Sequence, residues 1–159
     1  MDSKLKGYLE KNGVNYILHK HSAVFTVSES DSNESIKKIP GLRCKTLFLK
    51  SEHDMFYLVG MPGKKRLDIK NLERHLGVKK LRFASEEELE RELKTRAGSV
   101  SIFGAINSSN VWLILDKEVW LADRVCFHPN INTETLELKH EDLERFYNSL
   151  DNRKEIVEL

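Results

Sequence analysis

The segment from Gly41 to Lys50, GLRCKTLFLK, constrains the fold most strongly, because it carries apolar side chains on both faces of an expected strand. Successive side chains of a strand point to opposite faces, so Phe48 lies on one face and Leu47 and Leu49 lie on the other. A strand that is apolar on both faces has to be covered on both sides. The segment therefore predicts a central strand of a sheet.

The same alternation places Lys45 on the face of Leu47 and Leu49. Burying an ammonium group costs free energy unless a partner balances its charge or the group opens into a cavity. Two interpretations stay open at this point. Lys45 either lies near the edge of the strand and extends its charge to water, or it serves a pocket.

The rest of the chain alternates short strands with helices. Apolar spacing and capping residues predict helices over 2–13, in a short segment after Thr26, over 68–77, over 85–94 and over 140–150. Alternation predicts further strands over 14–19, 55–60, 79–84, 111–116, 118–127 and 133–138. Ser85 and Glu88 have the spacing of a capping box. We expect one domain over 1–159, with an α/β (α+β-like) fold built on a single-layer mixed sheet of about six to seven strands with surrounding helices.

The composition excludes several classes of protein. An apolar fraction of 40% supports a folded core, and no run of 18 apolar residues predicts a membrane span. The first residues, MDSKLKGYLEKNG, lack the apolar stretch of an export signal, which favours a cytoplasmic location. Cys44 and Cys126 have neither metal nor redox spacing and are expected to be buried reduced thiols. The sequence has no glycine-rich phosphate loop, nucleophile elbow or histidine cluster at metal spacing, so none of these three kinds of site is expected.

The charge is distributed unevenly, although the formal net charge is only +1. Residues 1–80 contain 16 lysines and arginines against 9 acidic residues, whereas residues 81–159 contain 10 against 16. A basic face of this kind is able to bind a polyanion such as RNA. Solvated surface charges explain the same composition, and the run Lys64-Lys65-Arg66 is open to both interpretations.

Two irregular segments interrupt the regular pattern. The first, FHPNIN from Phe127 to Asn132, ends a strand, because Pro129 removes a hydrogen-bond donor from the ladder. The second, GSVSIFG from Gly98 to Gly104, is rich in small residues, and glycine lets backbone N–H groups approach a ligand closely. Each segment is either an ordinary turn or loop, or the wall of a site.

Taken in chain order, these segments resemble the YbaK-type aminoacyl-tRNA deacylases. The matching stretches are TVSES, KTLFLK, RLDIKNLERHLGVKKLRFASEEEL, GSVSIFGAIN and FHPNINTETLEL. Each motif alone is weak, but the set in this order is specific, and it extends from Tyr16 to Phe146. More narrowly, the chain is similar to the free-standing prolyl-tRNA editing proteins of the ProXp-ala or PrdX kind.

The resemblance implies hydrolysis of the ester that joins a wrong amino acid to tRNA, chiefly alanine on tRNA(Pro), with no metal or organic cofactor. It implies that Lys45 is the catalytic residue. The substrate-binding residues that it implies are Thr26, Gly98, Ser101, Phe103, Gly104, Phe127, His128 and Asn132. The implied partners are the acceptor end of a mischarged tRNA and, as a second candidate, prolyl-tRNA synthetase, with neither DNA nor a membrane.

The residue types suit this chemistry. An ammonium group aimed at the ester stabilises the charge that develops in the transition state, and glycine-rich backbone N–H groups are able to complete an oxyanion site. No side chain of the motifs is an evident nucleophile, and the family resemblance implies that the free hydroxyl of the terminal ribose activates the attacking water. A synthetase pocket that fits proline rejects alanine by only about 1–3 kcal/mol, so a second and smaller sieve is needed.

Three positions depart from the family pattern: Ile102 replaces a usual proline, Ser108 a usual acidic residue and Asn130 a common leucine. These changes flank the expected pocket, so serine and cysteine stay open as alternatives to alanine. Two other functions also stay open. One is a binding module of the same fold without turnover, and the other is a hydrolase that uses Cys44 or Cys126 as its nucleophile.

Overall fold

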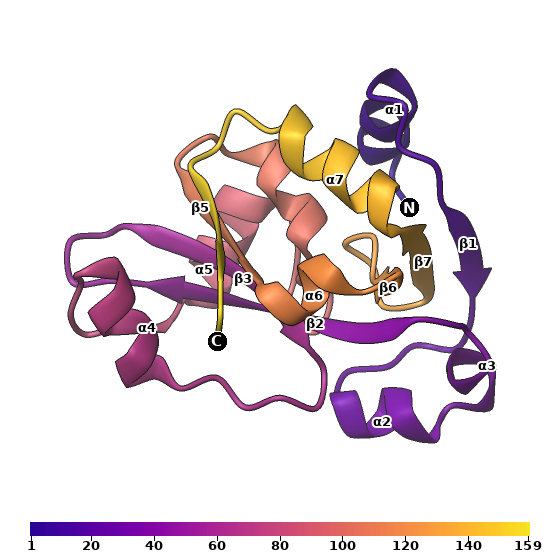
Figure 1. Cartoon of the computed structure of the whole chain (residues 1–159), viewed down its shortest axis with the longest axis horizontal. Helices are drawn as coiled ribbons and strands as arrows, with labels where there is room; N and C mark the ends of the chain where they lie inside the picture. Colours follow the sequence, from indigo (N-terminus) through magenta and orange to yellow (C-terminus); the bar gives the residue numbers. More distant parts are fainter.

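The computed structural model describes residues 1–159 and consists of short strands and helices (Figure 1). The strands are β1 (Ile17–Lys20), β2 (Leu42–Lys50), β3 (Phe56–Pro62), β4 (Arg82–Phe83), β5 (Val111–Asp116), β6 (Arg124–Phe127), β7 (Glu134–Lys139) and β8 (Lys154–Val157). The helices are α1 (Ser3–Lys11), α2 (Val27–Ser32), α3 (Glu34–Lys37), α4 (Ile69–Leu76), α5 (Glu86–Glu88), α6 (Lys117–Leu121) and α7 (His140–Ser149), together with a π-helical turn, η1 (Leu89–Leu93), and a 3-10 helix, η2 (Ile102–Asn107). None of these helices has both the length and the apolar character needed to cross a membrane.

The strands form one mixed sheet in the order β1-β7-β6-β2-β3-β5-β8, and the short strand β4 pairs with β2. The pairs β2–β6, β3–β5 and β5–β8 are parallel, and the others are antiparallel. Helices lie on both faces of the sheet (Figure 1). The expected α/β fold with a mixed sheet and surrounding helices is therefore confirmed.

Strand β2 lies in the middle of the sheet and is covered on both faces, as its sequence predicts. Phe48 belongs to the larger core, in which α1, η1, η2 and α7 pack on one face of the sheet. Leu49 belongs to the smaller core on the opposite face, which includes Leu72 of α4. The two apolar faces of this one strand thus contribute to two separate cores.

The neighbours of β2 change along its length, and this change leaves a gap in the sheet. On one side, β3 pairs with β2 from Cys44 to Lys50. On the other side, β6 pairs with it only at Leu42 and Arg43, and β4 pairs with it only from Leu49 onwards. The edge of β2 between these two short strands faces no strand.

The register shows which backbone groups face this gap. The carbonyl of Arg43 accepts a hydrogen bond from Gly63 N–H on the β3 side, at 2.8 Å. Because residues of an antiparallel pair exchange hydrogen bonds at every second position, the odd-numbered residues of β2 bond to β3. The N–H and C=O groups of Thr46 therefore point away from β3, into the gap.

Helix ends follow the signals in the sequence. Thr26 caps α2, and Asp68 caps α4, which ends at Gly77 in the left-handed conformation. Ser85 and Glu88 form the expected capping box at the start of α5. Local sequence thus sets where these helices begin and end.

Three segments differ from the sequence-based expectation. Residues 118–121, expected as strand, form α6, because Asp116 accepts a hydrogen bond from Glu118 N–H (3.0 Å) and Val119 is buried in the larger core. The irregular segment from Gly98 to Gly104, for which no helix was expected, leads into the 3-10 helix η2 at Ile102. Residues 154–157 add an eighth strand, β8, beside β5. Its sequence, Lys-Glu-Ile-Val, does not show an apolar alternation.

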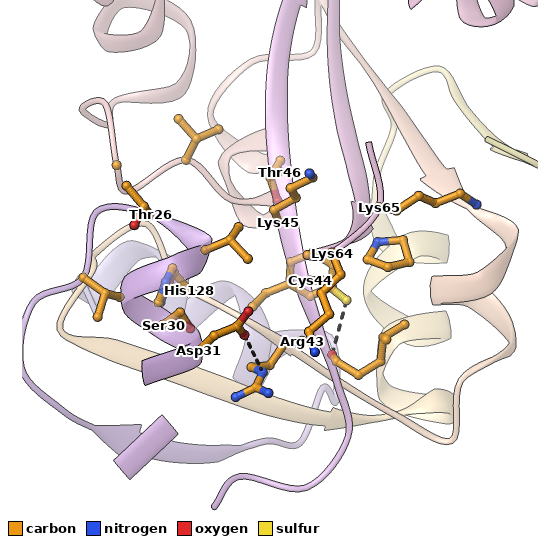
Figure 2. A pocket seen from close by; sticks show the side chains of 18 of the residues that line it. Thr26, Ser30, Asp31, Arg43, Cys44, Lys45, Thr46, Lys64, Lys65 and His128 are labelled. Carbon is orange, nitrogen blue, oxygen red and sulfur yellow. Dashed lines mark hydrogen bonds and ion pairs between the residues drawn. The ribbon is translucent and has the colours of Figure 1, made fainter. Parts of the chain in front are cut away.

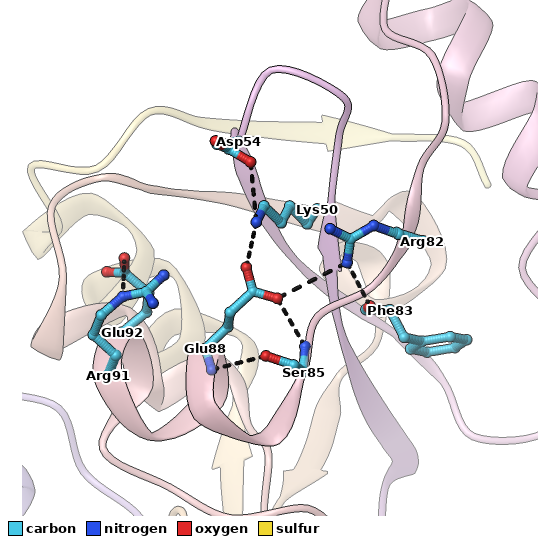
Figure 3. A network of polar contacts seen from close by, with 8 residues as sticks. All are labelled: Lys50, Asp54, Arg82, Phe83, Ser85, Glu88, Arg91 and Glu92. Atoms are coloured by element: carbon cyan, nitrogen blue, oxygen red, sulfur yellow. Dashed lines mark hydrogen bonds and ion pairs between the residues drawn. The ribbon is translucent and has the colours of Figure 1, made fainter.

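A cluster of charged side chains joins the far end of β2 to α5 (Figure 3). Lys50 Nζ lies 2.5 Å from Glu88 Oε2 and 3.0 Å from Asp54 Oδ1. Burial raises the pKa of Glu88, but the hydrogen bonds from Lys50 and Ser85 outweigh burial and lower that pKa from 4.5 to about 2. The charged form of Glu88 is therefore the one that the fold favours.

We predict that Glu88→Gln lowers the free energy of unfolding by on the order of 1 kcal/mol at pH 7, because glutamine keeps the capping hydrogen bond but loses the charge that pairs with Lys50. The unfolded chain takes up the Glu88 proton near pH 4.5 and the folded chain only near pH 2. The difference in the free energy of unfolding between Glu88→Gln and the wild type is therefore complete above pH 4.5 and disappears as the pH falls from 4.5 to about 2. Urea unfolding of both proteins between pH 2 and 7 measures this difference.

The matched control is Glu86→Gln, because Glu86 is exposed in the same first turn and makes no ion pair with Lys50. We expect its effect to stay within about 0.5 kcal/mol at every pH. A destabilisation by Glu88→Gln that did not change with pH would contradict the charge-pairing explanation.

Candidate active site

A cavity of about 770 Å³ opens where β2 has no neighbouring strand (Figure 2). Its wall is formed by β2, by α2 and the segment before it, by the loop after β3, by the loop before η2 and by the end of β6. In Figure 2, Thr26 and His128 lie on one side of β2 and Lys65 lies on the other. The lining residues used below are Phe25, Thr26, Arg43, Lys45, Lys65 and His128.

Lys45 lies in β2 opposite Met61 of β3, is half-buried and lines the cavity. Burial lowers the pKa of its ammonium group, and no carboxylate contributes to this shift. A partly desolvated charge without a protein partner interacts more strongly with a substrate atom than the same charge does in water. Lys64 also lines the cavity without an ion pair, but it is exposed to solvent. Lys45 is therefore the unpaired cation of this site that is best placed to stabilise negative charge.

Two other cations of the wall are already paired with carboxylates. Arg43 Nε lies 3.6 Å from Asp31 Oδ1, and this contact links α2 to β2. Lys65 Nζ lies 2.9 Å from Oδ2 of Asp116, which is 1% exposed. Their charges are partly neutralised by these partners, whereas that of Lys45 is not.

His128 follows the last residue of β6 and lines the same cavity. Its Nδ1 lies 2.7 Å from the carbonyl oxygen of Glu134, which only accepts hydrogen bonds, so Nδ1 carries a proton. Burial lowers the pKa of His128, and the nearby ring of His21 lowers it further, although the Glu134 carbonyl acts in the opposite direction. At neutral pH the ring is uncharged, and its Nε2 has a free lone pair.

Asn130 joins the two irregular segments that the sequence singles out. It adopts a left-handed φ of 61° directly after Pro129. Its Oδ1 accepts a hydrogen bond from the Ser101 hydroxyl at 3.1 Å, and its carbonyl accepts one from the Thr95 hydroxyl at 3.4 Å. The sequence marks Asn130 only as a departure from the family pattern. The preference of asparagine for left-handed turns is the signal that identifies this role.

The structure brings five of the nine residues implied by the resemblance to the cavity wall: Thr26, Lys45, Gly98, Phe127 and His128. The other four, Ser101, Phe103, Gly104 and Asn132, lie behind the wall. Phe103 is fully buried, and its ring packs edge-on against that of Phe127 with 6.4 Å between the centroids. The Ser101 hydroxyl accepts a hydrogen bond from Phe103 N–H at 3.0 Å, so this pair supports the wall from inside the core.

Gly104 and Asn132 also act on the wall through their neighbours. A Cβ at Gly104 would lie 3.3 Å from Leu93, so this glycine allows η2 to pack closely on η1. The carbonyl of Asn132 accepts a hydrogen bond from Val24 N–H at 3.2 Å. This bond fixes the chain that leads into α2.

Neither cysteine is suited to nucleophilic attack. Burial raises the pKa of the Cys44 thiol, and burial together with Glu137 raises that of Cys126 to about 12. Both thiols donate to backbone carbonyls, Cys44 to Leu42 at 3.4 Å and Cys126 to Pro40 at 3.3 Å. A thiol in this state stays protonated at neutral pH.

The model of the family described as "Aminoacyl-tRNA editing domain" matches residues 21–146, which include every part of this wall. The chain belongs to this family. It is 34% identical over 154 residues to the prolyl-tRNA editing protein ProX of Acetoanaerobium sticklandii, a match that covers 95% of this chain and 93% of ProX. It is 30% identical over 133 residues to prolyl-tRNA synthetase associated domain-containing protein 1 of Bos taurus, with 80% of this chain and 77% of that protein covered.

Solved structures show the same fold at lower sequence identity. The crystal structure of a proposed trans-editing enzyme for prolyl tRNA synthetase is similar to this chain with a TM-score of 0.76 and 19% identity. The similarity covers 100% of this chain and 98% of that one. The mixed sheet with its covering helices is therefore a fold that this chain shares with that protein.

We predict that His128 titrates below the value of about 6.5 that a free imidazole has, because burial disfavours its charged form. As the pH falls, the unfolded chain takes up this proton before the folded chain does. The contribution of the neutral ring to the free energy of unfolding is therefore lost as the pH falls from the pKa of the unfolded chain through that of the folded chain. An NMR titration of the ring carbons measures the midpoint and the tautomer, and His128→Gln assigns the signal. A midpoint above 6.5, or a proton on Nε2 at pH 7, would contradict this description.

Proposed function

We propose that this protein hydrolyses the ester bond of mischarged tRNA and that its main substrate is alanine attached to tRNA(Pro). The observation that carries the proposal is the half-buried Lys45 ammonium, which has no carboxylate partner and lines one cavity together with a neutral His128. Membership in the editing-domain family and the 34% identity to ProX support the same class of reaction.

The proposed chemistry relies on charge stabilisation. An aminoacyl ester is already activated, so the main requirement is to stabilise the negative charge that grows on the carbonyl oxygen as water attacks. Lys45 supplies a positive charge with no competing partner. The N–H group of Thr46 faces the same gap in the sheet and offers a second donor to that oxygen. No side-chain nucleophile is needed, in agreement with the raised pKa values of both cysteines.

His128 has a positioning role in this proposal. Because Nδ1 donates to the Glu134 carbonyl, Nε2 is left to accept a hydrogen bond inside the cavity. The substrate offers two donors of suitable chemistry, the ammonium group of the amino acid and the free hydroxyl of the terminal ribose. A neutral imidazole accepts from either group without adding a second positive charge beside Lys45.

Size selection follows from the rigidity of the wall. Phe127 is 2% exposed and is supported from behind by Phe103. A packed aromatic pair of this kind moves little, so it limits the volume available to the amino-acid side chain. A small rigid sieve admits alanine and excludes the larger ring of proline.

We predict that Lys45→Ala lowers kcat for hydrolysis of Ala-tRNA(Pro) by about 100-fold or more, since removing one group that stabilises an oxyanion has effects of this size. The measurement is the release of free alanine, with Pro-, Ser- and Cys-charged tRNA tested in parallel. The matched control is Lys6→Ala, which removes an exposed lysine of α1 outside the cavity and should leave kcat unchanged.

The results separate the alternatives. Release of alanine alone supports Ala-tRNA(Pro) as the proposed substrate. Preferential release of serine or cysteine would contradict this proposal and identify that amino acid as the preferred one. Retention of every aminoacyl-tRNA by the wild type would refute the hydrolase and favour a binding module. An equal loss of kcat in Lys45→Ala and Lys6→Ala would refute the special role of Lys45.

A further inference from the structure

Phe25 is an exposed aromatic residue on the wall of the cavity, directly before the N-cap of α2. Its side chain is 65% exposed, whereas the other phenylalanine of the wall, Phe127, is 2% exposed. Of the six large apolar residues that the fold leaves exposed, Phe25 is the one that lines this cavity.

The backbone at Phe25 is held firmly even though the ring is exposed. Its N–H donates to Glu29 Oε2 at 2.9 Å, which joins it to the first turn of α2. The preceding residue, Val24, is buried, and its N–H donates to the Asn132 carbonyl at 3.2 Å. The ring is therefore carried by backbone that is fixed on both sides.

Gly98 lets the ring lie against the opposite loop. Its φ is 86°, and a Cβ at this position would lie 3.2 Å from Phe25 Cδ1. A larger residue at position 98 would press on the ring. The ring edge and this loop thus form one continuous part of the cavity wall.

The size of the cavity indicates a ligand larger than an amino acid. At about 770 Å³ it lies in the range of about 300–1,000 Å³ that is usual for pockets binding drug-sized ligands, and an alanyl group alone would fill only part of it. If the ester lies at Lys45, the remaining space has to hold the group on the other side of the ester bond. In every aminoacyl-tRNA that group is the terminal adenosine.

We propose that the ring of Phe25 is the platform on which this terminal adenine base stacks. The inference rests on the proposed function and deepens it, because it identifies the residue that binds the nucleoside part of the substrate. Aromatic side chains commonly bind unpaired bases in this way, and removing one costs about 5- to 150-fold in binding. Stacking by Phe25 would hold the base at the cavity wall while the ester reaches Lys45.

The test uses two alanylated RNA minihelices, one ending in adenosine and one ending in an abasic ribose. We expect Phe25→Leu to raise KM for the adenosine-ended RNA by about tenfold with little change in kcat, because leucine keeps an apolar side chain but has no aromatic face. Phe25→Tyr keeps the aromatic face and should behave like the wild type. For the abasic RNA, the wild type and Phe25→Leu should have the same KM.

The matched control is Phe83→Leu, because Phe83 is similarly exposed, at 60%, but lies in β4 outside the cavity. An unchanged KM in Phe25→Leu would overturn the proposal. So would an equal rise in KM for both RNAs, since a merely structural role of Phe25 does not depend on the base.

Failure of this inference is distinguishable from failure of the proposed function. If the wild type hydrolyses neither RNA, the proposed hydrolase is refuted, and fluorescence anisotropy with the same RNAs carrying a non-hydrolysable alanyl amide still tests Phe25. A loss of affinity in Phe25→Leu that is confined to the adenosine-ended RNA supports stacking. Equal affinities of Phe25→Leu and the wild type for that RNA overturn it.

Discussion

The site depends on a difference in length between one central strand and two of its neighbours. Strand β2 has nine residues, whereas β6 has four and β4 has two, and each of these pairs with only one end of β2. Buried backbone groups need hydrogen-bond partners, so an unpaired edge in the middle of a sheet persists only where water or a ligand has access. The cavity at Thr46 is the place where that requirement is met.

The same gap explains the charge arrangement around it. Arg43 and Lys65 each pair with a carboxylate, which offsets part of the cost of holding their charges in the fold. Lys45 has no such partner, and burial disfavours its charge. A fold that keeps a residue of this kind gives up some stability locally, and such local conflicts are characteristic of functional sites.

Features that depend on local sequence were predictable, and features that depend on distant pairing were not. The alternation in β2, the caps of α2 and α4 and the capping box at Ser85 follow from residues close together in the chain. The position of the charged Lys45 on an apolar face of β2 was predictable from the same alternation. The gap was not, because it arises from strands that lie far from β2 in sequence and pair with it only briefly. Strand β8 and helix α6 were missed because tertiary contacts override weak local patterns there.

The hydrogen bonds of Asn130 have a consequence for how this pocket changes in evolution. One side chain and one carbonyl of that residue hold the loop before η2 against the turn after β6, so neither segment sets the shape of the wall alone. Substitutions in the two segments should therefore be non-additive, because a change that is tolerated in one depends on the residue present in the other. A shift of this pocket towards another amino acid would then require paired changes, and single substitutions would tend to lose the old preference before a new one appears.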